Sequence, residues 1–348
     1  LLQKLLADDG VIFISIDDTE CSNLILICNE IFGASNFVAN VSWQRTYSPR
    51  NDSKGIVSEV EHLVVFSKNP GWQPNKLPRT EAMDSRYKNP DNDVAPWKSS
   101  DAFAPGAATH QGMVYAIQHP FTGEMLYPSN GRCWRYQQSS MLEYMQGWCN
   151  YRLENLHDEK ERARVCGIDE SAVRKDVLAI VLEEPLEVSA AKAQKVYNRG
   201  RWPGFYFTKG GYGGIARKTY LENVGGRLPT NLWMYEETGH TDEAKKELIS
   251  LFGGRSPFDT PKPTRLLDFV LKVAGTSENL MLDSFAGSGT TAHAVLNANK
   301  ADNGNRHFIL IEMMDYADSI TAERVKRVIK GYGEGKNAVE GTGGNFSF

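Results

Sequence analysis

The sequence predicts an α/β fold that is interrupted by a long insertion. Towards both ends of the chain, apolar runs of strand length alternate with amphipathic helical stretches, which is the pattern of a doubly wound sheet. In the middle this pattern is lost, and proline, tryptophan, tyrosine and glycine become frequent. A chain of 348 residues is long enough for two compact domains. We therefore predict a split α/β domain with a second, α+β domain inserted into it.

We place the domain boundaries where these residue patterns change. Residues 1–72 and 236–330 are predicted to be the two halves of the split domain, and 73–235 the insertion. The remaining segment, 331–348, is rich in glycine and is predicted to be a loosely held tail.

The first half of the split domain contains the expected pattern of strands and a helix. Val11–Ile16 form a continuous apolar run, typical of a parallel strand buried on both faces. Asp17 or Asp18 is placed to cap the helix that follows. Two further strands are expected at 37–44 and 62–67.

The second half resumes the regular alternation after the insertion. Two amphipathic helices are followed by a strand, a glycine turn with a helix, a second strand and a closing helix. We expect helices at 242–251 and over residues 266–274 with its end at Gly275, a strand at 280–284, a helix that ends at Asn299, a strand at 308–312 and a last helix from about 319 to 330.

The bulk composition indicates a cytoplasmic protein. No apolar run approaches the roughly 20 residues that a membrane-spanning helix needs, and the first residues do not resemble a signal peptide. The five cysteines include no C-x-x-C pair, and the histidines lack ligand spacing. We therefore expect no membrane association, no disulfide framework and no bound metal.

The strongest functional signal is a glycine turn between an expected strand and an expected helix. Asp283-Ser284-Phe285-Ala286-Gly287-Ser288-Gly289-Thr290-Thr291 places two glycines where a ligand can approach the backbone and the free N–H groups of a helix start. Glu312 ends the next strand, where an acid can accept hydrogen bonds from a ribose. The spacing also satisfies the NAD fingerprint G-x-G-x-x-G/A, so an NAD oxidoreductase is an alternative. A tight turn that binds no ligand is a second alternative.

This turn resembles the S-adenosylmethionine motif F-x-G-x-G of DNA amino-methyltransferases. In the permuted β-class the motif follows a helix led by Lys-Pro, and Lys262-Pro263 stand in that place. The resemblance covers nearly the whole chain and points to the modification (Mod) subunits of Type III restriction–modification systems. The matching stretches are 9–18, 31–33, 86–93, 197–202, 239–244, 305–308, 320–325 and 341–344.

The resemblance implies a Rossmann-like, permuted methyltransferase whose insertion recognises the DNA target. Such an enzyme transfers a methyl group from S-adenosylmethionine to N6 of an adenine flipped out of double-stranded DNA. It also implies a Mod homodimer and a helicase-nuclease (Res) partner. The residues that it assigns to the cofactor are Lys262, Pro263, Asp283, Phe285, Ala286, Gly287, Ser288, Gly289, Thr290 and Glu312.

The sequence departs from the family at one point, because the catalytic tetrapeptide D-P-P-Y occurs nowhere in residues 1–348. The resemblance places it upstream of Leu1, and the absence of an initiator methionine suggests a longer chain. We therefore name no catalytic residue and expect this chain alone to be inactive. A non-catalytic DNA-specificity module and a cytosine N4 methyltransferase remain open as alternatives.

Two basic stretches are candidates for DNA contact, although the net charge of the chain is −4. Cations and aromatic residues alternate in the later part of the insertion, a mixture that can hold phosphates and stack on bases. A solvated basic loop beside an aromatic core would look the same, and Trp43 and Trp134 are themselves expected in the core. The candidates are Arg199, Arg201, Trp202, Lys209, Tyr212, Arg217 and Lys218 in the insertion, and Arg45, Arg50 and Lys54 in a polar stretch before it.

Overall fold

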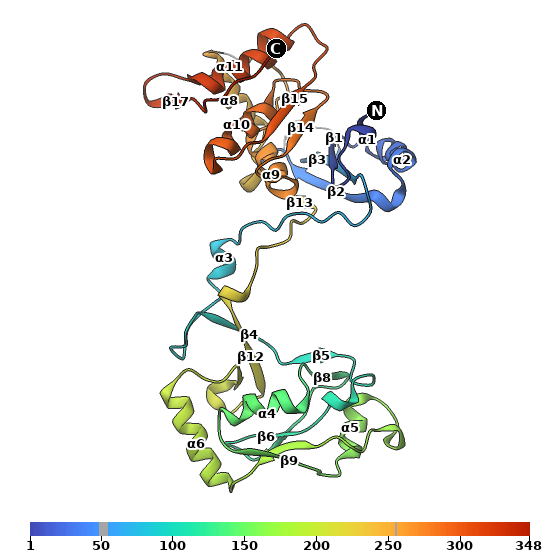
Figure 1. Cartoon of the computed structure of the whole chain (residues 1–348), viewed down its shortest axis with the longest axis vertical. Coiled ribbons are helices and arrows are strands. Elements are labelled where there is room, and N and C mark those ends of the chain that lie inside the picture. Colours follow the sequence, from blue (N-terminus) through green and yellow to red (C-terminus); the bar gives the residue numbers. More distant parts are fainter. Residues whose placement is uncertain (49–54, 255) are drawn as a thin grey trace. The chain divides into compact units, whose positions relative to one another are not determined.

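The computed structural model describes residues 1–48, 55–254 and 256–348, which form two compact units (Figure 1). The larger unit joins Leu1–Pro78 to Gly226–Phe348, and the smaller unit is the intervening stretch Arg79–Gly225. Each unit is described by itself. None of the helices in these described stretches is both long enough and apolar enough to cross a membrane.

One sheet of the larger unit has four strands in the order β1-β3-β2-β13. β3 pairs antiparallel with both β1 and β2, and β13 pairs parallel with β2. The three strands expected in the first half are thereby confirmed. The strands are β1 (Val11–Ile16), β2 (Phe37–Gln44), β3 (Val60–Ser67) and β13 (Leu232–Trp233).

The expected environment of the first strand is wrong. β1 is antiparallel to its neighbour, lies at the edge of the sheet, and is mostly half-buried instead of buried on both faces. A continuous apolar run indicates only that a strand has little contact with water. It does not record the direction of the partner strand or whether partners lie on both sides.

Helices cover both faces of this sheet, and adjacent residues of β3 point to opposite sides. Val64 packs against α2 (Cys21–Phe32), whereas Val65 packs against α9 (Thr264–Ala274). The result is a three-layer α/β arrangement whose core lies on either side of β3.

The expected capping of α2 by Asp17 or Asp18 is wrong. The residue at the N-cap is Glu20, whose side chain makes no capping hydrogen bond. Asp17 accepts a hydrogen bond from the Thr19 amide (3.1 Å), and Asp18 lies 2.8 Å from the ring of His62. The turn after β1 therefore uses both carboxylates before the helix begins.

The second sheet of the larger unit consists of two parallel strands, β14 (Leu280–Asp283) and β15 (His307–Leu310), connected through α10 (Thr290–Asp302). Met281 and Phe308 face α9 and α10 and pack in a common apolar cluster. The opposite face of the sheet carries exposed apolar side chains. They include Leu280, Leu282 and Ile309.

The remaining helices of the larger unit surround these sheets. The expected helices at 242–251 and over 266–274 are confirmed, and the one expected from about 319 to 330 is present with a π-helical first part. A π-helical segment, Ala317–Ala322, leads directly into the last helix. The helices are α1 (Leu2–Leu5), α7 (Tyr235–Thr238), α8 (Thr241–Phe252) and α11 (Glu323–Lys330).

The glycine-rich tail is attached to the larger unit, so the expectation that it is loosely held is wrong. β16 (Gly331–Tyr332) pairs with β17 (Val339–Glu340), and the Thr342 amide donates to the Val328 carbonyl (3.0 Å). Phe346 packs against the apolar cluster beside α11. Composition alone suggested mobility, whereas the glycines serve the turns of a hairpin.

The smaller unit combines helices with three sheets around an aromatic core that includes Trp134, Trp148 and Phe207 (Figure 1). The four-stranded sheet consists of β7 (Met125–Leu126), β6 (Ile117–Gln118), β10 (Ala179–Leu182) and β9 (Tyr151–Glu154). The other two consist of β11 (Phe205–Phe207), β12 (Ile215–Tyr220) and β4 (Trp97–Asp101), and of β5 (Phe103–Pro105) with β8 (Arg132–Trp134). The helices are α3 (Glu81–Asp84), α4 (Gln138–Gln146), α5 (Glu159–Cys166) and α6 (Leu186–Arg199).

Short 3-10 turns complete both units. They are Ala34–Asn36, Gln111–Met113, Glu170–Ala172, Lys209–Gly211, Leu221–Asn223 and Gly335–Asn337.

Candidate functional site

The glycine turn lies between the end of β14 and the start of α10. Gly287 and Gly289 have φ values of 53° and 78°, in the left-handed region that favours glycine. A β-carbon at Gly289 would lie only 3.0 Å from the Thr321 carbonyl oxygen, so a larger residue would have to displace backbone. Phe285, in contrast, is 83% exposed on the outside of the turn. The turn can therefore present backbone and one aromatic ring to a ligand.

Asp283 fixes the shape of this turn. One carboxylate oxygen accepts a hydrogen bond from the Phe285 amide (3.1 Å). The other accepts from the hydroxyl of Thr291 (2.6 Å) in the first turn of α10. A single acid thus joins the end of the strand to the start of the helix.

Glu312 follows β15 and lies beside the same turn. Its Oε2 accepts a hydrogen bond from the Gly287 amide (2.8 Å), and its Oε1 accepts from the Met314 amide (3.1 Å). The turn and the acid that were singled out from sequence are therefore neighbours. Each carboxylate oxygen has a further lone pair with which to accept a hydroxyl donor.

Lys262 and Pro263 immediately precede α9 and adjoin the glycine turn. The Lys262 carbonyl accepts a hydrogen bond from the hydroxyl of Thr290 (3.2 Å). The Lys262 ammonium extends the other way, to Glu61 of β3 (2.5 Å) and over the ring of Trp43 of β2 (5.7 Å from its centre). This segment therefore joins the four-stranded sheet to the first turn of α10.

Arg324 of α11 lies behind the turn and was not singled out from sequence. Its guanidinium is fully buried and donates to the hydroxyls of Ser288 (3.0 Å) and Thr290 (2.9 Å). It also donates to Thr264 at the start of α9 (3.1 Å) and forms an ion pair with Glu247 of α8 (2.8 Å). The one signal in the sequence is an arginine on the buried face of an amphipathic helix, which it shares with Val325 and Val328 in the structure.

His293 of α10 completes this network. Its ring lies 3.1 Å from the Arg324 guanidinium. Burial, with a smaller effect of the positive charge of Arg324, lowers the pKa of His293 to about 3. The histidine is therefore neutral at physiological pH and can accept a hydrogen bond from the arginine.

The candidate DNA contacts before the insertion are described only in part. Arg45 is exposed, and its carbonyl accepts a hydrogen bond from the Thr241 amide (3.0 Å). Arg50 and Lys54 lie outside the described residues. The role of Arg45 at DNA remains a prediction.

Most of the candidates in the insertion are accessible and lie on two neighbouring turns. Arg199 and Arg201 are exposed and Trp202 is half-buried on the turn that ends α6. Lys209 and Tyr212 are exposed on the turn between β11 and β12. A β-carbon at Gly211 in this second turn would contact the ring of Tyr197 in the first (3.6 Å), which shows how close the two turns are. Arg217 of β12 is half-buried, with its Nε 3.3 Å from the Asp101 carbonyl oxygen.

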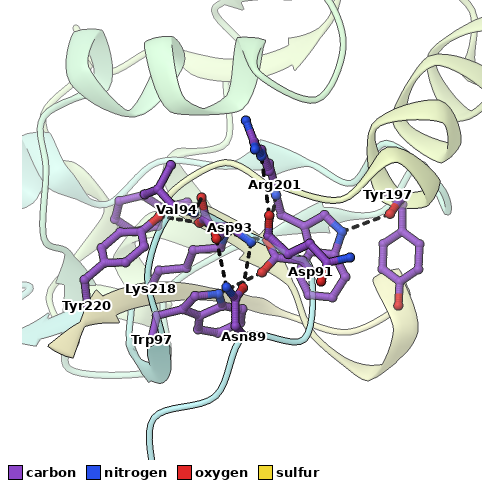
Figure 2. A network of polar contacts seen from close by, with 12 residues as sticks. Asn89, Asp91, Asp93, Val94, Trp97, Tyr197, Arg201, Lys218 and Tyr220 are labelled. Atoms are coloured by element: carbon purple, nitrogen blue, oxygen red, sulfur yellow. Dashed lines mark hydrogen bonds and ion pairs between the residues drawn. The ribbon is translucent and has the colours of Figure 1, made fainter.

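Lys218 differs from the other candidates because its ammonium is buried and paired with carboxylates inside the smaller unit. Figure 2 shows its ammonium between Asp91, at 2.5 Å, and Asp93, with the ring of Trp97 beneath it. Burial by itself would raise the pKa of Asp93, but hydrogen bonds from Lys218 and Tyr220 outweigh burial and lower it. A buried and neutralised ammonium cannot reach a phosphate, so we omit Lys218 from the proposed DNA contacts.

Comparisons with known proteins identify the family. A family model described as DNA methylase (N6_N4_Mtase) matches residues 1–323. The chain is 30% identical to the Mod subunit of the Type III restriction-modification enzyme StyLTI of Salmonella typhimurium, over 94% of this chain and 43% of that protein. It is 27% identical to the EcoPI Mod subunit of Escherichia phage P1, over 90% of this chain and 43% of that protein.

A Type II relative shows a similar level of identity. The methyltransferase M.KpnI of Klebsiella pneumoniae is 27% identical, over 89% of this chain and 63% of that protein. The chain thus spans less than two thirds of the length of each of these relatives. Because the family model covers more than nine tenths of the residues, the chain belongs to the N6_N4_Mtase family of DNA methylases.

Proposed function

We propose that this chain is part of a site-specific DNA adenine N6-methyltransferase, the modification subunit of a Type III restriction–modification system. The observation that carries the proposal is the contact between the glycine turn and Glu312, 2.8 Å from the Gly287 amide, within a chain of the DNA methylase family. We further propose that the parallel pair β14–β15 with α10 is the cofactor half of a Rossmann-like, permuted sheet.

The hydrogen-bonding groups of the turn suit S-adenosylmethionine. Its two left-handed glycines let the turn pack closely against Phe258 and Thr321, and the following helix start offers N–H groups. When bound, this cofactor supplies an electrophilic methyl group. We propose that Glu312 accepts hydrogen bonds from the ribose hydroxyls and that Phe285 covers the adenosyl group.

The remaining assigned residues would shape the pocket from behind. Asp283 holds the two ends of the turn, and Thr290 ties it to the Lys262 carbonyl. Residues 286 to 289 would line the methionine side through their backbone, together with Pro263 at the start of α9. These residues would bind and orient the cofactor. We assign no residue of this chain as a proton donor, proton acceptor or nucleophile in the reaction.

Cofactor binding can be tested on the chain as it stands. Isothermal titration with S-adenosylmethionine should give a single site, and Glu312→Gln should weaken it, whereas NAD should not bind. Binding of NAD in place of S-adenosylmethionine would overturn the assignment of the turn. We expect no methyl transfer by residues 1–348 alone, because the D-P-P-Y tetrapeptide is not among them.

The reaction and its target are tested on the chain extended by a segment that carries D-P-P-Y. Duplex DNA incubated with the extended protein and S-adenosylmethionine should contain N6-methyladenine within one short sequence, as read by single-nucleotide mapping. Modified cytosine would replace the adenine assignment by cytosine N4. Cofactor and DNA binding without any modification would favour a non-catalytic specificity module.

The proposed partners follow from the relatives named Mod subunits of Type III enzymes. We propose that the protein forms a homodimer and associates with a Res subunit. Light scattering of the purified extended protein tests the dimer, and co-purification with the Res subunit tests the second association.

A further inference from the structure

The smaller unit contains a hollow that neither the glycine turn nor the proposed catalytic chemistry uses. We call it the Asn92–Arg199 pocket. It forms where two segments that are about a hundred residues apart in sequence meet, the turn 89–94 and the turn 197–202 (Figure 2). Its lining residues are Pro90, Asp91, Asn92, Tyr197, Asn198, Arg199, Gly200 and Trp202.

Asp91 holds the two turns together. Its carbonyl accepts a hydrogen bond from the Arg201 amide (2.7 Å), and its carboxylate accepts from the Trp202 amide (2.7 Å). The same carboxylate accepts a hydrogen bond from the Lys218 ammonium, as Figure 2 shows. At Gly200 a β-carbon would lie 2.4 Å from the Asp91 carbonyl oxygen, so the approach of the two turns requires glycine there. The pocket is therefore rigid.

The pocket presents hydrogen-bond donors and positive charge. Arg199, in the lining, is exposed and has no carboxylate partner among the described residues, whereas Arg132, Arg152, Arg164 and Arg174 of the same unit are ion-paired. Arg201 is exposed beside the lining, with its Nε 3.4 Å from the Asn92 carbonyl oxygen. Asn92 is exposed, and Asn198 accepts a hydrogen bond from Gln194 through its carbonyl, which leaves its NH₂ group free. The one acid in the lining, Asp91, is 3% exposed and already satisfied.

Two residues at or beside the pocket have left-handed backbone conformations, which are common for asparagine but unusual for arginine. Asn92 and Arg201 have φ values of 52° and 49°. Such conformations cost free energy and persist where the surroundings impose them, often at binding sites. Here the cross-links through Asp91 impose them on both turns.

We propose that the Asn92–Arg199 pocket binds a backbone phosphate of duplex DNA, independently of base sequence. Guanidinium and carboxamide donors around a rigid hollow match the several acceptor oxygens of a phosphodiester. The buried Lys218 acts as a positioning residue, because it fixes Asp91 and through it both turns. The proposal rests on the proposed function only in taking DNA as the ligand.

The test measures DNA binding in the absence of methyl donor. The probes are two fluorescein-labelled duplexes of unrelated sequence, titrated by anisotropy at several salt concentrations. Arg199→Ala should raise Kd about tenfold on both duplexes and reduce the slope of log Kd against log salt by about one charge. Arg174→Ala, an exposed and ion-paired arginine of the same unit, is the matched control and should leave Kd unchanged.

A second variant separates binding from folding. Asn92→Gly removes the side-chain donor and relieves the positive φ, so it should weaken binding to both duplexes without lowering the melting temperature. Unchanged Kd in both variants would overturn the proposal. A loss restricted to one duplex would also overturn it, in favour of base recognition. Because no methyl transfer is measured, these outcomes are separable from the failure of the proposed reaction.

Discussion

In each unit of this protein a buried cation lies behind the turn that we propose as a binding site, Arg324 in the larger unit and Lys218 in the smaller, and the two cations are satisfied differently. Arg324 in the larger unit has one carboxylate partner, Glu247, whose side chain is 23% exposed, and otherwise donates to neutral hydroxyl and imidazole groups. Lys218 in the smaller unit has two carboxylate partners, Asp91 and Asp93, both of them buried or nearly so.

The difference reflects the shapes of the two charged groups. A guanidinium is a planar fork of five donors, so Arg324 can join α8, α9, α10 and the glycine turn at one point. An ammonium is a compact charge, so Lys218 neutralises the acids of a single turn. In both units, nevertheless, the buried charge lies directly behind a turn that carries exposed functional groups. We conclude that each network serves the turn in front of it.

Replacement of Lys218 should have the largest effect. Lys218→Met leaves Asp91 and Asp93 buried without a cation, and we expect a loss of about 3–5 kcal/mol in the unfolding free energy of the smaller unit. Urea denaturation measures it, with Lys192→Met, a partly exposed partner of Glu184, as the control. Cofactor affinity should not change. A parallel loss of S-adenosylmethionine binding would break the comparison, because it would mean that the two networks are not separate.

Replacement of Arg324 should have a somewhat smaller effect on stability and a larger one on the cofactor. Arg324→Met should lower the unfolding free energy of the larger unit by about 2–4 kcal/mol. The loss is smaller than for Lys218 because Glu247, left without its partner, can still reach water. Arg324→Lys keeps the charge but loses the fork, and it should weaken S-adenosylmethionine binding about tenfold in isothermal titration. Lys326→Met on the same helix, exposed and weakly paired, is the control. Cofactor binding equal to that of the control would show that the network is merely structural.

The pH dependence of stability should differ between the two networks, because among the described residues only the Arg324 network contains a buried histidine, His293. Its pKa is lowered from 6.5 to about 3, so its stabilising contribution is complete above pH 6.5 and is lost as the pH falls towards 3. Between pH 7 and pH 5 this group should account for a loss of about 2 kcal/mol. His293→Gln should remove that part of the loss in urea titrations at the two pH values. The same acid sensitivity in the variant would contradict the assignment.

The smallest expected effect concerns the front of the cofactor turn. Glu312→Gln keeps the shape of the side chain but removes its charge and one of the two acceptors for the Gly287 and Met314 amides, so we expect about tenfold weaker S-adenosylmethionine binding and a loss of about 1 kcal/mol in unfolding free energy. Asp315→Asn, at a nearby exposed acid, should change neither quantity. Comparison of this variant with Arg324→Lys then shows how much of the free energy of S-adenosylmethionine binding depends on Glu312 and how much depends on Arg324 behind the turn.

Much of the larger unit could be predicted from local sequence. The strands β1, β2 and β3 and the helices α8, α9 and α11 lie where apolar periodicity places them. The same holds for the burial of Trp43 and Trp134, each 1% exposed. The glycine turn was recognisable because its requirements lie within ten consecutive residues, and Glu312 because it follows the next strand.

Only the tertiary structure decided the direction of pairing of β1, the attachment of the tail and the position of each buried cation. Lys218 and Asp91 are 127 residues apart, and Arg324 and Glu247 are 77 residues apart. A lysine in a basic, aromatic stretch has the same local sequence whether it faces solvent or a distant carboxylate. Burial of a charge depends on partners that folding brings from elsewhere in the chain, so local sequence identifies a turn, while long-range contacts determine what lies behind it.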